Sequence, residues 1–125
     1  MNVPSNFKFA KSDEWFDPTS GAVGISDYAQ NQLSDIVFVE ILVEEGEEVT
    51  EGKMIASIES VKASSEIYSP ASGKVSAVNK GLTDKPETLN SDAFGEGWMI
   101  KIEGGTAVDV MDAAEYEKYC EGRTH

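Results

Sequence analysis

Lys62 is the residue whose position in this sequence is best suited to chemistry. Two runs of β-forming residues, Met54 to Glu59 and Ser65 to Tyr68, flank the segment Ser60-Val61-Lys62-Ala63, and this pattern predicts a hairpin with the lysine at its tip. An exposed lysine is almost fully protonated at neutral pH and is a poor nucleophile. It can instead present its side chain to an enzyme that attaches an activated acyl group. From the residues alone, this interpretation and that of an ordinary solvated turn lysine both stay open.

The rest of the chain predicts a mostly β domain that would hold this hairpin. Strands are expected at 7–10, 14–16, 22–25, 36–43, 74–78 and 98–102, separated by turn residues, which favours a sandwich or small barrel. Ser26 predicts the N-cap of a short helix over 27–33, and Asp112 with Glu115 has the spacing of a capping box. We expect a single domain over 1–125, with a loose tail at 1–6, an irregular connection at 79–97 and a C-terminal helical segment at 106–122.

Composition excludes several classes of partner. The net charge of −13, from 23 acidic and 10 basic residues, argues against nucleic acid or an anionic membrane surface. Arg123 is the one arginine in the sequence, and the apolar run at 36–43 is too short to span a bilayer. Cys120 is the one cysteine, and we expect it to be a small apolar helix-face residue rather than a reactive thiol.

The sequence also lacks most constellations that would indicate an enzyme. Its one histidine is the last residue, His125, so neither a serine nor a cysteine nucleophile has a credible base. It contains no paired-cysteine zinc motif, no EF-hand loop and no glycine-rich nucleotide loop between strand and helix. We therefore expect no independent catalytic activity.

The run Glu59-Ser60-Val61-Lys62-Ala63 resembles the lipoylation motif of the H proteins of the glycine cleavage system. The resemblance extends over residues 7 to 120 and includes, in the family's order, the blocks at 23–30, 33–40, 68–70, 72–73 and 95–102. Biotin carriers of related fold place methionine on both sides of their lysine, whereas Lys62 lies between Val61 and Ala63. Lipoyl domains of 2-oxoacid dehydrogenases usually have aspartate where this chain has Val61.

The resemblance implies a non-catalytic carrier with a barrel-sandwich hybrid fold: two small antiparallel sheets, a short helix after the third strand and a C-terminal helix. Lipoic acid would be attached to Lys62 through an amide by a lipoate-attaching enzyme. The implied partners are glycine decarboxylase (P protein), aminomethyltransferase (T protein) and dihydrolipoyl dehydrogenase (L protein). An alternative function is a lipoyl relay or interaction module that supplies lipoyl groups to other enzymes. The expected location is the mitochondrial matrix, in a processed form, with bacterial cytoplasm as the alternative.

The resemblance also implies a cleft that shelters the loaded arm, with Ser12, Glu14 and Glu66 at the matching positions. Hydroxyl and carboxylate oxygens at these positions suit an ammonium group. Two residues depart from the family pattern: Asp13 stands where histidine is common, and Glu66 where aspartate is common. The extra charge of Asp13 would either hold the amine more tightly or lie in solvent.

Overall fold

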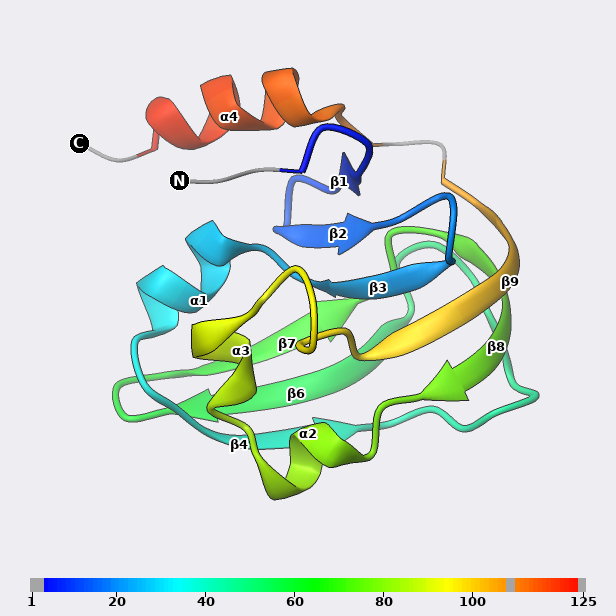
Figure 1. The fold of residues 1–125 in the computed structure, drawn as a ribbon, viewed down its shortest axis with the longest axis horizontal. Coiled ribbons are helices and arrows are strands. Elements are labelled where there is room, and N and C mark those ends of the chain that lie inside the picture. Colours follow the sequence, from blue (N-terminus) through cyan, green and yellow to red (C-terminus); the bar gives the residue numbers. More distant parts are fainter. Residues whose placement is uncertain (1–3, 108–109, 124–125) are drawn as a thin grey trace.

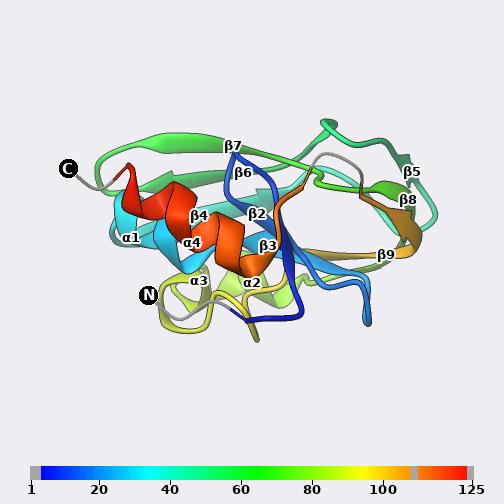
Figure 2. The same cartoon turned by 90° about the horizontal axis from the view of Figure 1, so that it is seen from above.

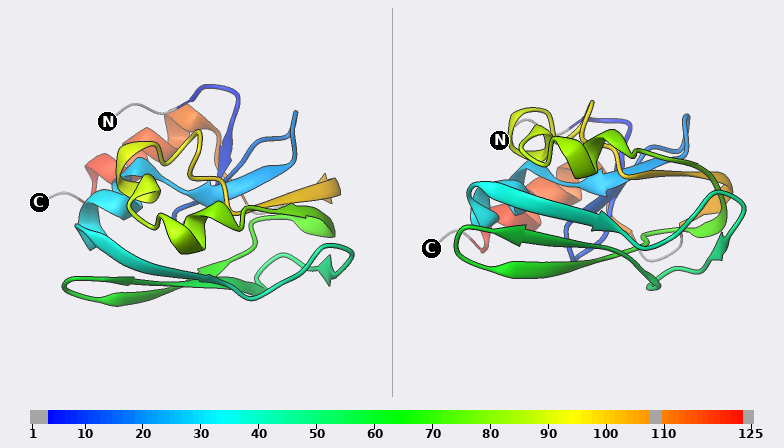
Figure 3. Two further views of the ribbon diagram at one scale, coloured as in Figure 1. Left: turned by 60° about the horizontal axis from the view of Figure 1, so that its bottom comes forward. Right: turned by 90° about the horizontal axis from the view of Figure 1, so that it is seen from below.

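The computed structural model describes residues 4–107 and 110–123. Within them the strands form two antiparallel sheets (Figure 1). The larger sheet has the order β1 (Lys8–Phe9), β2 (Glu14–Phe16), β3 (Ala22–Ile25), β9 (Ile100–Thr106), β8 (Ser72–Val78) and β5 (Glu48–Val49). The smaller sheet has the order β4 (Ile36–Ile41), β6 (Met54–Ser60) and β7 (Ser64–Tyr68), which lie side by side in Figure 3. This arrangement confirms the mostly β fold with two antiparallel sheets.

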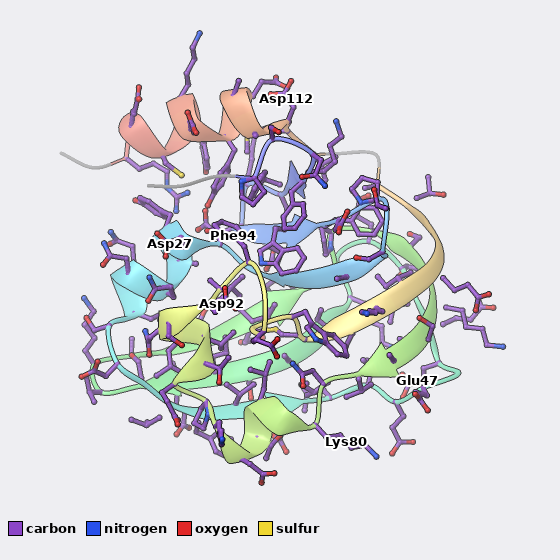
Figure 4. The ribbon with its side chains drawn as sticks, viewed as in Figure 1. Asp27, Glu47, Lys80, Asp92, Phe94 and Asp112 are labelled. Atoms are coloured by element: carbon purple, nitrogen blue, oxygen red, sulfur yellow. The ribbon has the colours of Figure 1, made fainter. Side chains whose placement is uncertain are left out.

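Four helices accompany the sheets in the described residues: α1 (Asp27–Leu33), α2 (Gly81–Asp84), α3 (Thr88–Ser91) and α4 (Ala113–Glu121). The Ser26 side chain caps α1 by accepting from the Ala29 N–H, as predicted. Asp112, labelled at the start of α4 in Figure 4, forms the predicted capping box with Glu115. In Figure 2, β6 and β7 form one side of the molecule, while α2 and α3 lie on the opposite side. No helix in the described part of the chain is long and apolar enough to cross a membrane.

The apolar side chains form two clusters. The main cluster fills the space between the sheets and includes Ile25, Val39, Ile58, Ile67 and Ile100. The second attaches α4 to β1 and β2, where the ring of Tyr116 stacks on Phe9 with 4.4 Å between centroids. Trp15 belongs to the same aromatic group and contacts Phe94, which is labelled in Figure 4. Cys120 is 2% exposed within this cluster, which confirms its expected place on the buried helix face.

Gly24 shows why this aromatic cluster constrains the sequence. It lies directly opposite Trp15 in the pairing of β2 with β3. A Cβ at position 24 would lie 2.8 Å from the Trp15 ring, closer than carbon atoms approach in packed interiors. The indole therefore lies flat against the strand only because position 24 has no side chain.

The structure corrects several of the boundaries predicted from the sequence. The connection at 79–97 is not wholly irregular, because α2 and α3 form within it and bury Leu82 and Leu89. The last strand, expected at 98–102, runs from Ile100 to Thr106, because β9 gains its hydrogen bonds from β8. The C-terminal helix begins at Ala113, whereas the helical segment was expected from 106; before it, Met111 forms a bridge with Phe9.

The ends of the chain are only partly described. Pro4 accepts a backbone hydrogen bond from Phe7 at 3.3 Å, so a turn occupies the end of the segment that was expected to be a loose tail. Residues 1–3 of that segment and His125 lie outside the described residues.

Candidate attachment hairpin and cargo cleft

The hairpin of β6 and β7 presents Lys62 at its tip, at the left end of the molecule in Figure 1. The last pair of the ladder is Glu59 with Ser64, which leaves a four-residue connection. Ser60 closes it: the Ser60 N–H donates to the Ala63 carbonyl at 2.8 Å, and the Ser60 hydroxyl donates to the same carbonyl at 3.1 Å. The hydroxyl oxygen also accepts from the N–H groups of Lys62 at 3.4 Å and Ala63 at 3.1 Å. Ser60 thus forms hydrogen bonds with both Lys62 and Ala63 across the tip.

A second contact fixes the tip to the rest of the smaller sheet. The Val61 N–H donates to the Asp35 carbonyl, immediately before β4, at 3.0 Å. Val61 is 66% exposed, and both Lys62 and Ala63 are exposed. Among the described residues, Lys62 forms no ion pair. The backbone under the lysine is therefore held while its side chain is accessible, which is the geometry that an attachment point needs.

Glu14 is the buried member of the predicted cleft. It lies on β2 and is 1% exposed. One carboxyl oxygen, Oε1, forms a short hydrogen bond with the Ser12 hydroxyl, and Oε2 accepts from the Tyr68 N–H at 3.0 Å. The side chain therefore bridges β2 and β7, which belong to different sheets.

Tyr68 connects this pair to Glu66. Its phenol donates to Glu66 Oε2 at 3.2 Å, and this hydrogen bond is the main cause of a raised pKa for the Tyr68 hydroxyl. Hydrogen bonds through Tyr68 thus connect the three residues predicted for the cleft, Ser12, Glu14 and Glu66. Tyr68 itself was missed in the site prediction, although its position two residues after Glu66 places both side chains on one face of β7.

The surface is hollowed on both sides of Tyr68. A hollow of about 440 Å³ includes Glu66 and the hairpin residues Glu59 and Ser64. A second, of about 270 Å³, includes Ser12 and Pro70, and Tyr68 lines both. Another hollow of about 440 Å³ lies between α1 and α4, but none of the predicted site residues line it.

Burial raises the pKa of the Glu14 carboxyl to about 7, against the opposing effect of the hydrogen bonds from Ser12 and Tyr68. Near neutral pH this group therefore exchanges a proton readily. A cation that reached it would favour the carboxylate, because an opposite charge stabilises the ionised form. The site can consequently bind an ammonium group by releasing a proton.

Asp13 does not lie free in solvent, one of the two roles considered from the sequence. Its carboxylate forms a bidentate ion pair with Arg123, at 2.6 Å to Nη1 and 2.9 Å to Nη2. The Tyr116 hydroxyl donates to the same carboxylate at 2.8 Å. Asp13 therefore attaches the end of α4 to the segment that carries Ser12 and Glu14.

Glu66 lies on β7, the arm of the hairpin that follows Lys62. The two residues are four positions apart, at most roughly 13 Å at ~3.3 Å per residue of extended chain. A side chain lengthened from Lys62 along the outer face of β7 would pass Glu66 before Tyr68 and the buried Glu14.

Comparisons with known proteins identify the family and the fold. The sequence model of the family described as Glycine cleavage H-protein matches residues 7–123. A glycine cleavage system H protein of Stenotrophomonas maltophilia is 48% identical over 122 residues, 95% of this chain and 92% of that protein. One from Deinococcus deserti is 48% identical over 118 residues, with coverage of 94% and 97%. The crystal structure of a glycine cleavage system H protein from Mycobacterium marinum superposes with a TM-score of 0.85 at 32% identity, covering 93% of this chain and 97% of that one.

Proposed function

This chain belongs to the glycine cleavage H-protein family, and we propose that it is the lipoyl carrier of that system. It would take the aminomethyl group of glycine from the pyridoxal-phosphate decarboxylase to the tetrahydrofolate-dependent aminomethyltransferase. It would then pass electrons to dihydrolipoyl dehydrogenase. H proteins are the non-catalytic carrier component, in line with the absence of a nucleophile–base pair from the sequence.

The residues at the hairpin tip fit an amide-linked lipoyl group. Lys62 offers an exposed primary amine, and its neighbours Val61 and Ala63 leave room for a lipoate-attaching enzyme to approach. The backbone hydrogen bonds of Ser60 hold the base of the arm without occupying the lysine side chain. When bound, lipoic acid supplies a dithiolane that accepts the aminomethyl group and the two electrons of the reaction.

We further propose that Ser12, Glu14 and Glu66 hold the amine of the cargo in the cleft. Glu14 provides a carboxylate that is screened from water, where an ion pair is stronger than at the surface. Glu66 is exposed and marks the entrance, and the Tyr68 phenol links it to the backbone that contacts Glu14. Exclusion of water would protect the carbon between nitrogen and sulfur from hydrolysis.

The observation that carries this proposal is the continuous chain of contacts from Ser12 through Glu14 and Tyr68 to Glu66, on the hairpin that bears Lys62. A lipoyl relay module needs the lysine but has no use for a buried carboxyl beside the arm. The cleft therefore favours the glycine carrier over the relay. A biotin carrier would bind avidin after modification, and we expect no such binding.

Intact mass of the protein isolated from its own cells tests the attachment. We expect one lipoyl adduct on the wild-type protein and none on the Lys62→Ala variant. A Lys62→Arg variant is the matched control, since it keeps the charge at the tip but offers no amine for the amide. An adduct retained by either variant would refute Lys62 as the site.

The relatives and the crystal structure named above come from bacteria, which gives no support to the expected mitochondrial location. We therefore propose bacterial cytoplasm as the location. The proposed partners are the three enzymes of the system and the lipoate-attaching enzyme. The charge of −13 makes nucleic acid and anionic membranes unfavourable partners.

A further inference from the structure

Asp13 lies between the two cleft residues of the N-terminal segment and has an unusual backbone conformation. Its φ of 79° is in the left-handed region, which residues other than glycine adopt rarely and which aspartate tolerates better than most. The Asp13 N–H donates to the Ala10 carbonyl at 3.0 Å, and its own carbonyl accepts from the Ser26 N–H at 2.8 Å. Such a conformation persists only where the surroundings enforce it.

Arg123 holds the side chain of Asp13. Its guanidinium donates both hydrogen bonds of the bidentate pair with Asp13 and lies over two rings, 4.4 Å from the centroid of Tyr28 and 4.7 Å from that of Tyr119. The Arg123 side chain is 30% exposed and that of Asp13 only 13%, so the pair is partly shielded from solvent. The sole arginine of the sequence is thus held in one orientation by α1, α4 and Asp13 together.

Tyr116 adds a third connection at the same carboxylate. Its hydroxyl donates to Asp13 Oδ1 and lies 2.5 Å from the Ser26 hydroxyl, which also caps α1. The turn that ends at Asp13 is therefore joined to the end of β3, the start of α1, Tyr116 of α4 and Arg123 just after α4. Ser12 and Glu14 are its immediate neighbours in the chain.

We propose that the Asp13–Arg123 pair positions Ser12 and Glu14 so that they can hold the cargo, although α4 itself lies outside the cleft. This inference rests on the proposed function. Arg123 acts through Asp13, and it is a positioning residue rather than one that touches the cargo. Its loss would let the turn relax from the left-handed conformation, which would separate the Ser12 hydroxyl from Glu14 and admit water to the buried carboxyl.

The double variant D13N/R123Q tests the proposal without changing the net charge. Removal of Arg123 alone would leave Asp13 unpaired beside Glu14 and raise the pKa of Glu14 by repulsion, which would obscure any effect of position. The matched control is E117Q/K118Q, which removes one charge of each sign from exposed positions of α4, the helix before Arg123. The variant R123K keeps the charge but lacks the planar fork, and serves as the second test if the double variant does not fold.

The first measurement is the carboxyl titration of Glu14 by carbon-13 NMR in the unlipoylated protein. The groups around Glu14 are Ser12, Asp13 and the Tyr68 N–H, with Glu66 beyond the Tyr68 phenol. We expect the pKa of Glu14 to fall by ~1 unit in R123K, which keeps the Asp13 charge, because hydration favours the carboxylate, and to stay unchanged in the control. In D13N/R123Q the loss of the Asp13 charge also lowers the pKa of Glu14, so the fall in R123K is the one that reports position. Because this titration needs no lipoyl group, it tests the positioning role even if the carrier function is wrong.

The second measurement is the hydrolysis of the loaded arm. Water cleaves the carbon–sulfur and carbon–nitrogen bonds of the aminomethyl group, releasing a thiol, formaldehyde and ammonium. Misplacing a positioned group by ~1 Å can cost up to ~100-fold, so we expect formaldehyde release to be ~10-fold faster in D13N/R123Q. If R123K keeps the wild-type titration and both variants keep the wild-type release rate while losing only thermal stability, the pair is merely structural and the proposal is overturned.

Discussion

Replacement of Glu14 by glutamine is predicted to change how stability depends on pH. Glutamine has nearly the same shape and is always neutral. Its carbonyl oxygen can accept from the Tyr68 N–H and its amide can donate to the Ser12 hydroxyl, the arrangement that a protonated Glu14 would also adopt. E14Q therefore imitates the protonated form of the wild-type side chain at every pH.

The expected magnitude follows from the raised pKa of Glu14. Burial moves it from 4.5 to about 7, a difference of 2.5 units (7 − 4.5). Between these values the folded state binds more protons than the unfolded state, so stability falls as pH rises. The contribution is fully present below pH 4.5 and is lost above pH 7. At ~1.4 kcal/mol per unit the total loss is about 3.5 kcal/mol, most of it between pH 5 and pH 8.

Urea unfolding at pH 5 and pH 8 measures this effect. The comparison of E14Q with wild type isolates Glu14, because all other carboxyl groups titrate in both proteins. We expect similar stability at pH 5, and E14Q to be the more stable by about 3 kcal/mol at pH 8. An equal difference between the two proteins at both pH values would refute a raised pKa for Glu14. An E117Q variant, changed at an exposed position of α4, controls for loss of a surface charge.

Three further predictions concern individual contacts. Y68F removes the phenol hydroxyl that donates to Glu66. We expect aminomethyl loss from the loaded arm to become ~5-fold faster, since one net hydrogen bond contributes ~1 kcal/mol. Unchanged formaldehyde release would show that the hydroxyl has no part in the cleft. D112A removes the capping box of α4 and should cost ~1 kcal/mol in urea unfolding, whereas an equally stable D112A would mean that the cap is not needed. G24A puts a methyl group 2.8 Å from the Trp15 ring and should lower stability by ~1–3 kcal/mol, with altered tryptophan fluorescence; a neutral result would contradict the close packing.

The sequence was most informative where structure is local. The hairpin around Lys62 and the two N-caps at Ser26 and Asp112 depend on residues a few positions apart, and their patterns can be read directly from the chain. The cleft residues Ser12, Glu14 and Glu66 required the family resemblance, because nothing in their own spacing brings β2 to β7.

Long-range contacts explain what the sequence could not predict. The partners Asp13 and Arg123 are 110 positions apart, and the charge of an aspartate alone does not indicate where its partner lies. Tyr68 donates its backbone N–H to a residue 54 positions away. The strand β9 continues through Gly104 and Gly105 because β8 pairs with it, which overrides the low strand preference of glycine.

Glycine–bicarbonate exchange with the pyridoxal-phosphate decarboxylase tests the central claim most directly. The lipoylated wild-type protein should support exchange of the glycine carboxyl with labelled bicarbonate, and the Lys62→Ala variant should support none. Lipoylated E14Q distinguishes the cleft from the attachment point, since it should still be loaded but lose its cargo to water more quickly. If lipoylated wild-type protein supports no exchange, the chain is not a carrier of the glycine aminomethyl group.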